Sequence, residues 1–247
     1  MKRFQTLSII IPCFNEEKFI EKTIDKVIKA NASGLGKEII IVDDGSKDNT
    51  PKILKGIENK YRQQPNQKQL SIRVTHQKNN QGKGAALKTG FLASSGDIVL
   101  VQDADLEYNP DEYPILLEPF LKNEADVVYG SRFISNKPHR VLYFWHSVGN
   151  TILTTLSNIF TNLNLTDMET GYKVFKGELI RKIARNLESK RFGFEPEITA
   201  RIAKIKGLKI YEVGISYTGR TYEEGKKIGW KDGVRAIWEI VKFNLSS

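Results

Sequence analysis

The chain lacks the features that mark secreted and membrane-spanning proteins. It has 247 residues and one cysteine, Cys13, so no disulfide can form within it, which fits a reducing compartment. No run of about 18 or more apolar residues occurs, so no segment is predicted to span a membrane. The opening residues also lack the basic and then apolar pattern of a secretory leader. These absences favour a cytoplasmic protein.

Several catalytic and cofactor motifs are missing as well. The three histidines do not have the spacing of metal ligands, and no serine–histidine pairing can be read from the sequence. No G-x-G-x-x-G motif follows the first apolar run, which argues against a Rossmann dehydrogenase. The glycine-rich stretch "NNQGKGAALKTG" (79–90) has Gly84 after Lys83, where a P-loop has Ser or Thr. The stretch is therefore not a P-loop.

What the chain does have is an excess of positive charge. Its 38 Lys and Arg outnumber 29 Asp and Glu, for a net charge of +9. Such a balance favours phosphates, nucleic acid or an anionic membrane face as partners. The excess is concentrated in residues 172–209, which hold eleven basic and four acidic residues. This segment is either a solvated helix surface or a source of attraction to anionic lipid.

Apolar runs alternate with helical patterns through the first half of the chain. Short runs rich in Val and Ile predict strands at 7–11, 38–43, 70–75, 97–102 and 125–130. Predicted helices between them begin near Asn15, Thr50, Gly84 and Asn109. This alternation predicts an α/β domain with a doubly wound, mostly parallel sheet and helices on both faces.

The pattern changes after Gly130. Residues 141–166 contain no Asp, Glu, Lys or Arg, and apolar side chains recur there at steps of three or four. They form one stripe of an amphipathic helix: Val141, Trp145, Val148, Ile152, Leu156, Ile159 and Leu163. The opposite face is polar. The stripe packs either on the core or a dimer partner, or on a membrane surface, for which Arg140, Tyr143, Phe144 and Trp145 resemble interfacial anchors.

Three acids spaced by two end the fourth predicted strand, in "VQDADLEYNP" (101–110). Clustered carboxylates repel one another and are costly unless a cation neutralises them. Oxygen ligands favour Mg²⁺ or Mn²⁺, and Mg²⁺ usually completes its shell with water and phosphate oxygens. Ligands of open parallel sheets bind at the carboxyl ends of the strands. Asp103, Asp105 and Glu107 therefore predict a seat for a metal–diphosphate.

Five blocks in order resemble the family-2 inverting glycosyltransferases with the GT-A fold, over residues 7–133. They are "SIIIPCFNEE", "IIIVDDGSKDNT", "NQGKGAALKTG", "DIVLVQDADLEYNP" and "VVYGSRF". Three later blocks look like the branch that makes polyprenyl-phosphate sugars, which includes the dolichol-phosphate mannose synthases. These are "DMETGYKVFKGELI", "FGFEPEITARIAKIKGLKIYEVGISY" and "GRTYEEGKKIGWKDGVRAIW".

The resemblance implies a single GT-A domain over 1–247. Residues 1–133 would bind the nucleotide sugar, and 134–247 would face the acceptor and the membrane. The implied reaction is an inverting, Mg²⁺- or Mn²⁺-dependent transfer of mannose or glucose from GDP-mannose or UDP-glucose to dolichyl or undecaprenyl phosphate. The enzyme would sit peripherally on the cytoplasmic membrane face, as a homo-oligomer or with a membrane partner subunit, and would bind no nucleic acid.

The resemblance also implies roles for individual residues. The nucleotide site would comprise Pro12, Phe14, Glu16, Asp43, Asp44, Lys83, Gly84 and Asp103. The metal would be held by Asp103, Asp105 and Glu107. Catalytic roles would fall to Asp105, Arg132, Arg220 and Lys227, and substrate binding to Arg140, Asp167 and Lys226. Many relatives have Tyr at Phe14, and mannose synthases often have Gln at Glu107, so the sugar preference does not carry over.

Plainer interpretations remain for some of these residues. Arg132 could pair with a nearby carboxylate, Asp167 could cap a turn, and Arg220, Lys226 and Lys227 could form a solvated loop. A phosphate acceptor is largely dianionic at pH 7 and needs no general base, and no carboxylate is identified as one.

Three other functions remain to be weighed. A family-2 enzyme with a soluble or polysaccharide acceptor would need a base. A nucleic-acid-binding protein would leave the acids unexplained. A nucleotidyltransferase would need a glycine-rich, arginine-containing turn where "PCFNEE" (12–17) stands.

Overall fold

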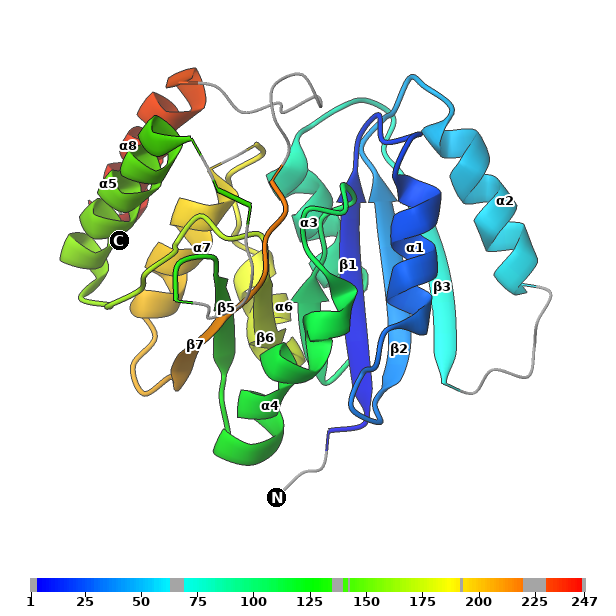
Figure 1. The fold of residues 1–247 in the computed structure, drawn as a ribbon, viewed down its shortest axis with the longest axis horizontal. Helices are drawn as coiled ribbons and strands as arrows, with labels where there is room; N and C mark the ends of the chain where they lie inside the picture. Colours follow the sequence, from blue (N-terminus) through cyan, green and yellow to red (C-terminus); the bar gives the residue numbers. More distant parts are fainter. Residues whose placement is uncertain are drawn as a thin grey trace.

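The computed structural model describes residues 4–62, 69–134, 140–141, 143–191, 193–219 and 230–245. Within these ranges the chain forms one seven-stranded sheet in the order β3-β2-β1-β4-β6-β5-β7 (Figure 1). The strands are β1 (Thr6–Cys13), β2 (Gly36–Asp43), β3 (Leu70–His76), β4 (Ile98–Val101), β5 (Val127–Ser131), β6 (Lys173–Lys176) and β7 (Ile210–Gly214). The helices are α1 (Ile20–Lys29), α2 (Thr50–Arg62), α3 (Lys83–Ala93), η1 (Pro110–Glu112, 3₁₀), α4 (Tyr113–Asn123), α5 (Phe144–Thr161), α6 (Gly177–Ala184), α7 (Phe194–Ala203) and α8 (Trp230–Leu245).

The predicted sheet is confirmed. All five predicted strands are present, and β1 pairs in parallel with β2 and with β4, as β2 does with β3 and β5 with β7. Only β6 among the described strands runs antiparallel, between β4 and β5. The sheet is therefore mostly parallel, and the first four strands follow the βα alternation that the sequence indicates.

The two faces of the sheet bury two separate apolar cores. Ile9 and Ile11 of β1 point to the face covered by α1, α2 and α4, while Ile10 points to the face covered by α3, α6 and α7. This division follows from the period of two along a strand. Because both faces are covered, the inner strands β1, β2 and β4 contain continuous buried apolar runs, as parallel strands usually do, whereas the edge strand β3 alternates apolar and polar residues.

Helix α1 does not begin where the sequence predicts. Asn15 was expected to cap it, but the helix begins at Ile20, and Asn15 has a left-handed φ of 53°. The side-chain oxygen of Asn15 accepts from the backbone N–H of Lys47 at 2.8 Å, and its own N–H donates to Ser46 Oγ at 2.9 Å. Asn15 therefore joins the loops after β1 and β2, because a residue that tolerates left-handed backbone fits that link better than a helix start.

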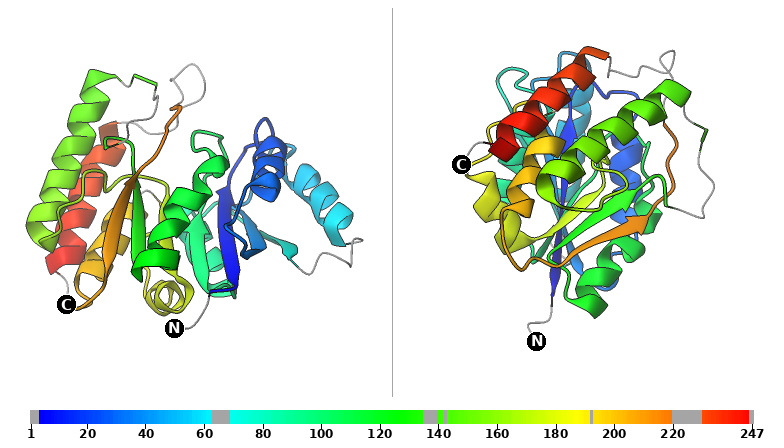
Figure 2. Two further views of the ribbon diagram at one scale, coloured as in Figure 1. Left: turned by 60° about the horizontal axis from the view of Figure 1, so that its bottom comes forward. Right: turned by 90° about the vertical axis from the view of Figure 1, so that its left-hand side faces the viewer.

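Helices α5 and α8 lie side by side, outside α7, at the end of the sheet beyond β7 (Figures 1 and 2). On α5 the polar face is the inner one: Asn150, Thr154 and Ser157 are buried. The apolar stripe faces outward, with Trp145 79% and Ile159 73% exposed. The interpretation in which the apolar stripe of α5 packs on the core is wrong, while packing on a dimer partner or on a membrane surface stays a prediction. Among the described residues, no helix has the length and apolar character needed to cross a bilayer.

Candidate functional site

The predicted site lies at the edge of the sheet where β1, β2 and β4 end. β1 and β4 are adjacent parallel strands, and the strand order reverses direction between them, which is where ligands bind in open α/β sheets. The backbone N–H of Asp44 donates to Cys13 O at 2.9 Å, and that of Gln102 donates to Ile10 O at 2.9 Å. The three polar strand ends therefore meet at one edge.

Asp103, the first acid of the cluster, is paired with a lysine. Lys83 Nζ lies 3.0 Å from Asp103 Oδ1 and 3.2 Å from Oδ2. The same ammonium lies 3.1 Å from Glu195 Oε1 on α7. Burial lowers the pKa of Lys83, but the two carboxylates outweigh it and hold that pKa well above its usual value. The carboxylate of Asp103 thus already holds a cation.

The other two acids do not converge with Asp103 on one point. Glu107 Oε2 accepts from the Tyr217 hydroxyl at 2.7 Å, while the backbone N–H of Glu107 donates to Asp105 Oδ1 at 3.2 Å. Leu106 between them has a left-handed φ of 61°. Within the described ranges no three His, Cys, Asp or Glu side chains could hold one metal ion. The three carboxylates are thus not gathered as a preformed metal site in the described structure, and the seat for a metal–diphosphate at Asp103, Asp105 and Glu107 stays a prediction.

Most residues predicted to bind the nucleotide are buried, and two of them, Asp43 and Asp44, hold loops in place. Asp44 accepts from the backbone N–H groups of Gln81 and Gly82, at 2.8 and 2.7 Å, and from the Asn80 side chain. Asp43 accepts from Ser46 N at 3.0 Å and lies 2.9 Å from His76 Nδ1. Both carboxylates therefore fix the loops around the site.

Pro12 and Glu16 are buried at the end of β1, while Phe14 is half-buried there. A groove of about 590 Å³ between α1 and α2 contains none of the predicted site residues.

Gly84 is needed for packing against another loop. A Cβ at Gly84 would lie 2.2 Å from the carbonyl oxygen of Ser189. The backbone N–H of Ala85 also donates to Lys190 O at 3.1 Å. The protein backbone that approaches Gly84 is reason enough for a glycine here, and its predicted contact with the nucleotide stays a prediction. Through this contact the start of α3 is joined to the segment that leads into α7.

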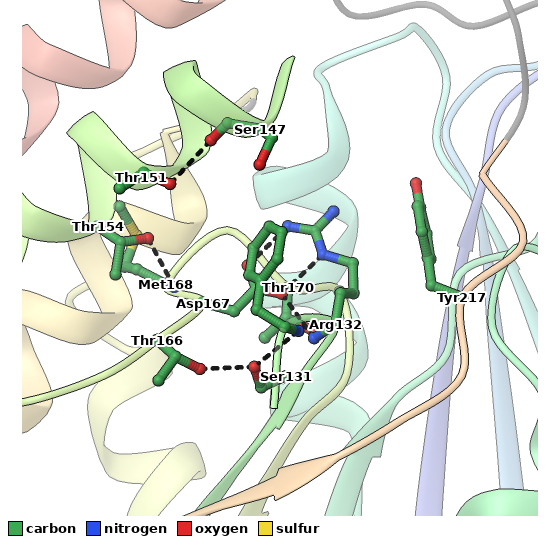
Figure 3. A network of polar contacts seen from close by, with 12 residues as sticks. Ser131, Arg132, Ser147, Thr151, Thr154, Thr166, Asp167, Met168, Thr170 and Tyr217 are labelled. Carbon is green, nitrogen blue, oxygen red and sulfur yellow. Dashed lines mark hydrogen bonds and ion pairs between the residues drawn. The ribbon is translucent and has the colours of Figure 1, made fainter. Parts of the chain in front are cut away.

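Arg132 and Asp167 form a buried bidentate ion pair (Figure 3). Arg132 Nε donates to Asp167 Oδ2 at 2.7 Å, and Nη2 donates to Oδ1 at 2.6 Å. Burial lowers the pKa of Arg132, but Asp167 outweighs it and raises that pKa well above its usual value. The plainer interpretation of Arg132 is the one that the geometry matches. Asp167 is fully buried and serves Arg132, so its expected role in substrate binding becomes that of orienting this guanidinium.

Tyr217 connects Arg132 and Arg140 with Glu107 of the acidic cluster. The Arg132 guanidinium lies 5.1 Å from the centre of the Tyr217 ring, whose hydroxyl donates to Glu107. Arg140 donates through its backbone to Tyr217 O at 3.2 Å and through Nη1 to Gly219 O at 3.0 Å. The remaining predicted basic residues, Arg220, Lys226 and Lys227, lie outside the described residues.

The structure adds residues that sequence reasoning did not single out. Besides Glu195, they include Lys173, a fully buried lysine that donates to the carbonyls of Met168 and Thr170 and lies over the Tyr129 ring. Burial lowers the pKa of Lys173, and burial together with Glu195 raises that of Glu169. These residues lie within the later sequence blocks, but nothing in the spacing of those blocks indicates that Lys173 and Glu169 lie close to Glu195.

Comparisons with known proteins identify the family of the chain. Residues 8–184 match the family described as glycosyl transferase family 2. The chain is 33% identical to a dolichyl-phosphate beta-glucosyltransferase, ALG5A, of Trichomonas vaginalis, over 97% of this chain and 73% of that protein.

Two further relatives act on other sugars by their names. The UDP-N-acetylglucosamine–dolichyl-phosphate N-acetylglucosaminyltransferase of Methanococcus voltae is 31% identical over 96% of this chain and 95% of that protein. The undecaprenyl-phosphate mannosyltransferase of Micrococcus luteus is 29% identical over 96% and 93%.

A solved structure shares the fold. Glucosyl-3-phosphoglycerate synthase of Mycobacterium tuberculosis, in complex with UDP, superposes with a TM-score of 0.72 at 21% identity. The match covers 97% of this chain and 80% of that one. At this identity the likeness concerns the GT-A fold alone.

Proposed function

The chain belongs to glycosyl transferase family 2 and is a glycosyltransferase. From this premise we propose that it transfers a hexose from a nucleoside-diphosphate sugar to the phosphate of a polyprenol such as dolichol or undecaprenol. Relatives named for dolichyl-phosphate and undecaprenyl-phosphate transfer support the acceptor class. These relatives align along nearly the whole of this chain, including its second half.

The observation that carries the lipid acceptor is the position of the exposed apolar face. Arg140 donates hydrogen bonds to the backbone carbonyls of Tyr217 and Gly219. The hydroxyl of the same Tyr217 donates to Glu107. Three residues further on, the exposed aromatic side chains begin with Tyr143, Phe144 and Trp145. An acidic site that could hold a metal–diphosphate is thus joined by a short segment to a surface suited to lipid. With a soluble acceptor, this surface would instead be expected to pack against a second copy of the chain.

The exposed apolar face extends over both outer helices. It continues along α5 with Ile152, Ile159 and Phe160 and on α8 with Val234, Ile237, Trp238 and Leu245. Interfacial helices place such side chains at the boundary between headgroups and acyl chains. We assign this α5–α8 face to the surface of a membrane, on which the enzyme would sit peripherally with the polyprenyl phosphate inserted beside it.

The D-x-D pair fits a hard divalent cation. Asp103 already holds an ammonium with both oxygens, and Asp105 follows at the same strand end. Two carboxylates are what Mg²⁺ or Mn²⁺ needs when the diphosphate supplies further oxygens. When bound, the ion neutralises charge that develops on the leaving diphosphate. Glu107 is the third candidate, but its hydrogen bond to Tyr217 would have to be shared or given up.

In the reaction, an oxygen of the acceptor phosphate attacks the anomeric carbon of the hexose. The carbon–oxygen bond to the acceptor forms as the bond to the diphosphate breaks, so the configuration inverts and the nucleoside diphosphate leaves. The guanidinium of Arg132, fixed by Asp167, would attract the acceptor phosphate toward this point. A phosphate that is largely dianionic needs no base to remove a proton.

The donor is proposed as UDP-glucose, with GDP-mannose as the second candidate. The relative at 33% identity is named a glucosyltransferase, and so is a protein of Dictyostelium discoideum at 33% over 86% of this chain. The mannosyltransferase of Micrococcus luteus, at 29%, supports the alternative.

Transfer of labelled hexose into lipid tests the proposal. The purified chain is mixed with vesicles that contain a polyprenyl phosphate, with UDP-glucose or GDP-mannose, and with Mn²⁺ or EDTA. We expect organic-soluble label from one donor, lost with EDTA and in Asp105→Ala. Label that passes only to water or to a soluble sugar would contradict the lipid-phosphate acceptor and leave the family intact.

A further inference from the structure

Lys83 is shared between two acids from different parts of the chain. Its ammonium lies 3.0 and 3.2 Å from the two oxygens of Asp103 and 3.1 Å from Glu195 Oε1. The cation of a D-x-D site would need the same Asp103 oxygens that the lysine now holds. Lys83 therefore occupies the position at Asp103 that a bound metal ion would need.

Glu195 has hydrogen-bonding capacity to spare. Its side chain is only 6% exposed, and among the described residues its second oxygen, Oε2, has no hydrogen-bond partner. A buried acceptor without a partner costs free energy, so such an atom in a folded protein calls for an explanation. Glu195 thus contacts the Lys83 ammonium with one oxygen and has a second oxygen that could also accept a hydrogen bond from it.

Backbone contacts join the segments that carry Lys83 and Glu195, and none of these contacts involves Asp103. Lys83 is the first residue of α3, and Glu195 lies in the first turn of α7. The two helix starts are joined by the contact of Gly84 with Ser189 and by the bond from Ala85 N to Lys190 O. On a fixed backbone, the flexible four-carbon stem of lysine can still move its ammonium from one acid to the other.

We propose that Glu195 is a positioning residue that takes over Lys83 when a divalent cation binds Asp103. This inference rests on the metal site of the proposed function. Without metal, Lys83 neutralises Asp103. With metal, Lys83 turns to both oxygens of Glu195 and stays beside the site as a positive charge for the donor diphosphate. The lysine is thus a competitor of the metal, and Glu195 weakens that competition.

Metal affinity tests the idea without any assay of transfer. Free Mn²⁺ is measured by electron paramagnetic resonance as it is titrated into the purified chain, alone and with UDP or GDP. Without nucleotide, Lys83→Met should bind Mn²⁺ about tenfold more tightly than wild type, because it removes one charge-assisted competitor from Asp103. Glu195→Gln should bind it about tenfold more weakly, because Lys83 then has only Asp103 as a partner.

The double variant separates positioning from simple charge. If Glu195 acts through Lys83, most of the loss caused by Glu195→Gln should vanish in the Lys83→Met background. Glu169→Gln is the matched control, since Glu169 is another carboxyl close to Glu195 but makes no ion pair with Lys83. Its Mn²⁺ affinity should stay within about twofold of wild type.

The outcomes distinguish a failure of the lysine exchange from a failure of the metal site itself. Equal affinities of wild type, Lys83→Met and Glu195→Gln would overturn the lysine exchange and leave the metal site standing. A full Glu195→Gln loss that persists without Lys83 would also overturn it. No Mn²⁺ binding by any form, with or without nucleotide, would remove both the exchange and the proposed metal site.

Discussion

Thr154 Oγ1, on the inner face of α5, accepts a hydrogen bond at 3.1 Å from the backbone N–H of Met168. Met168 directly follows Asp167, which holds Arg132 (Figure 3). The polar face of α5 is therefore turned inward to bond the loop that supports the arginine, and the apolar face is left outside. The contact between Thr154 and Met168 therefore connects α5, whose outer face is proposed to bind lipid, with the loop that positions Arg132, which is proposed to bind the acceptor phosphate.

Removing the charge of Asp167 should unsettle Arg132. Asp167→Asn leaves a buried guanidinium without its counter-charge, which typically costs about 3 kcal/mol or more in the free energy of unfolding. Urea unfolding measures that loss, and the transfer assay should show a fall in activity of at least about tenfold. The double variant Arg132→Met with Asp167→Asn should recover part of the stability but none of the activity. Full activity in the double variant would contradict the role of Arg132.

Charges placed on the α5–α8 face should prevent membrane binding. Trp145→Glu and Trp238→Glu alter side chains that are 79% and 64% exposed, so the fold should be unaffected. Each variant loses the favourable free energy of moving a tryptophan side chain from water into lipid, so its affinity for vesicles should fall roughly tenfold. Co-sedimentation with vesicles of anionic lipid measures it. Leu121→Glu, an exposed apolar position on α4, is the control and should bind as wild type does.

The acceptor assay separates this effect from damage to the site. Both tryptophan variants should keep their activity on a short, water-soluble polyprenyl phosphate. Unchanged vesicle binding, with self-association that falls in the variants, would instead make the α5–α8 face a dimer interface.

Two glycine substitutions should have opposite effects on stability. Gly84→Ala places a Cβ 2.2 Å from Ser189 O, so the start of α3 must move and Lys83 with it. We expect a loss of about 2 kcal/mol, as for overpacking in a tight core. Gly56→Ala on α2 is the control, because nothing lies within 4 Å of its added Cβ, and it should gain up to about 1 kcal/mol from helix propensity. Thermal or urea unfolding decides, and equal effects would contradict the close approach at Gly84.

The stability contributed by Glu38 should depend on pH. Burial raises the pKa of Glu38, but hydrogen bonds from Ser8 and Ser95 outweigh burial and hold the pKa below its usual value. A carboxyl with a lowered folded pKa stabilises the protein above its unfolded pKa, and that contribution is lost as the pH falls through the folded value. Glu38→Gln should therefore cost about 2 kcal/mol at pH 7. The difference from wild type should narrow below about pH 4, and a gap that stays constant to low pH would contradict this.

The strands and the acidic edge could be predicted because each depends on local pattern. Runs of Val and Ile such as β1 and β2 have few alternatives to a buried parallel strand, and a strand end rich in Asp must lie at the edge of the sheet. The partners of the acids could not be predicted. Lys83 and Glu195 are 112 positions apart, and no periodicity relates them to Asp103.

The amphipathic helix could be predicted as a helix, but the direction of its two faces could not. The spacing of its apolar residues predicts the stripe, yet which face turns inward depends on the hydrogen-bond donors and apolar surfaces that the rest of the fold places beside the helix. Here the loop from Thr166 to Thr170 offers backbone N–H groups, and Thr154 accepts one of them. The polar face was therefore the one with partners in the fold.

Two acceptors that share one tail decide whether the acceptor group is a phosphate. Purified chain, Mn²⁺ and the active donor are given either a polyprenyl phosphate or the corresponding free polyprenol, in vesicles of the same composition. We expect lipid-linked hexose from the phosphate only, since a phosphate needs no base and is attracted by Arg132. Equal transfer to the free alcohol would contradict the proposed phosphate acceptor, because an alcohol would require a catalytic base.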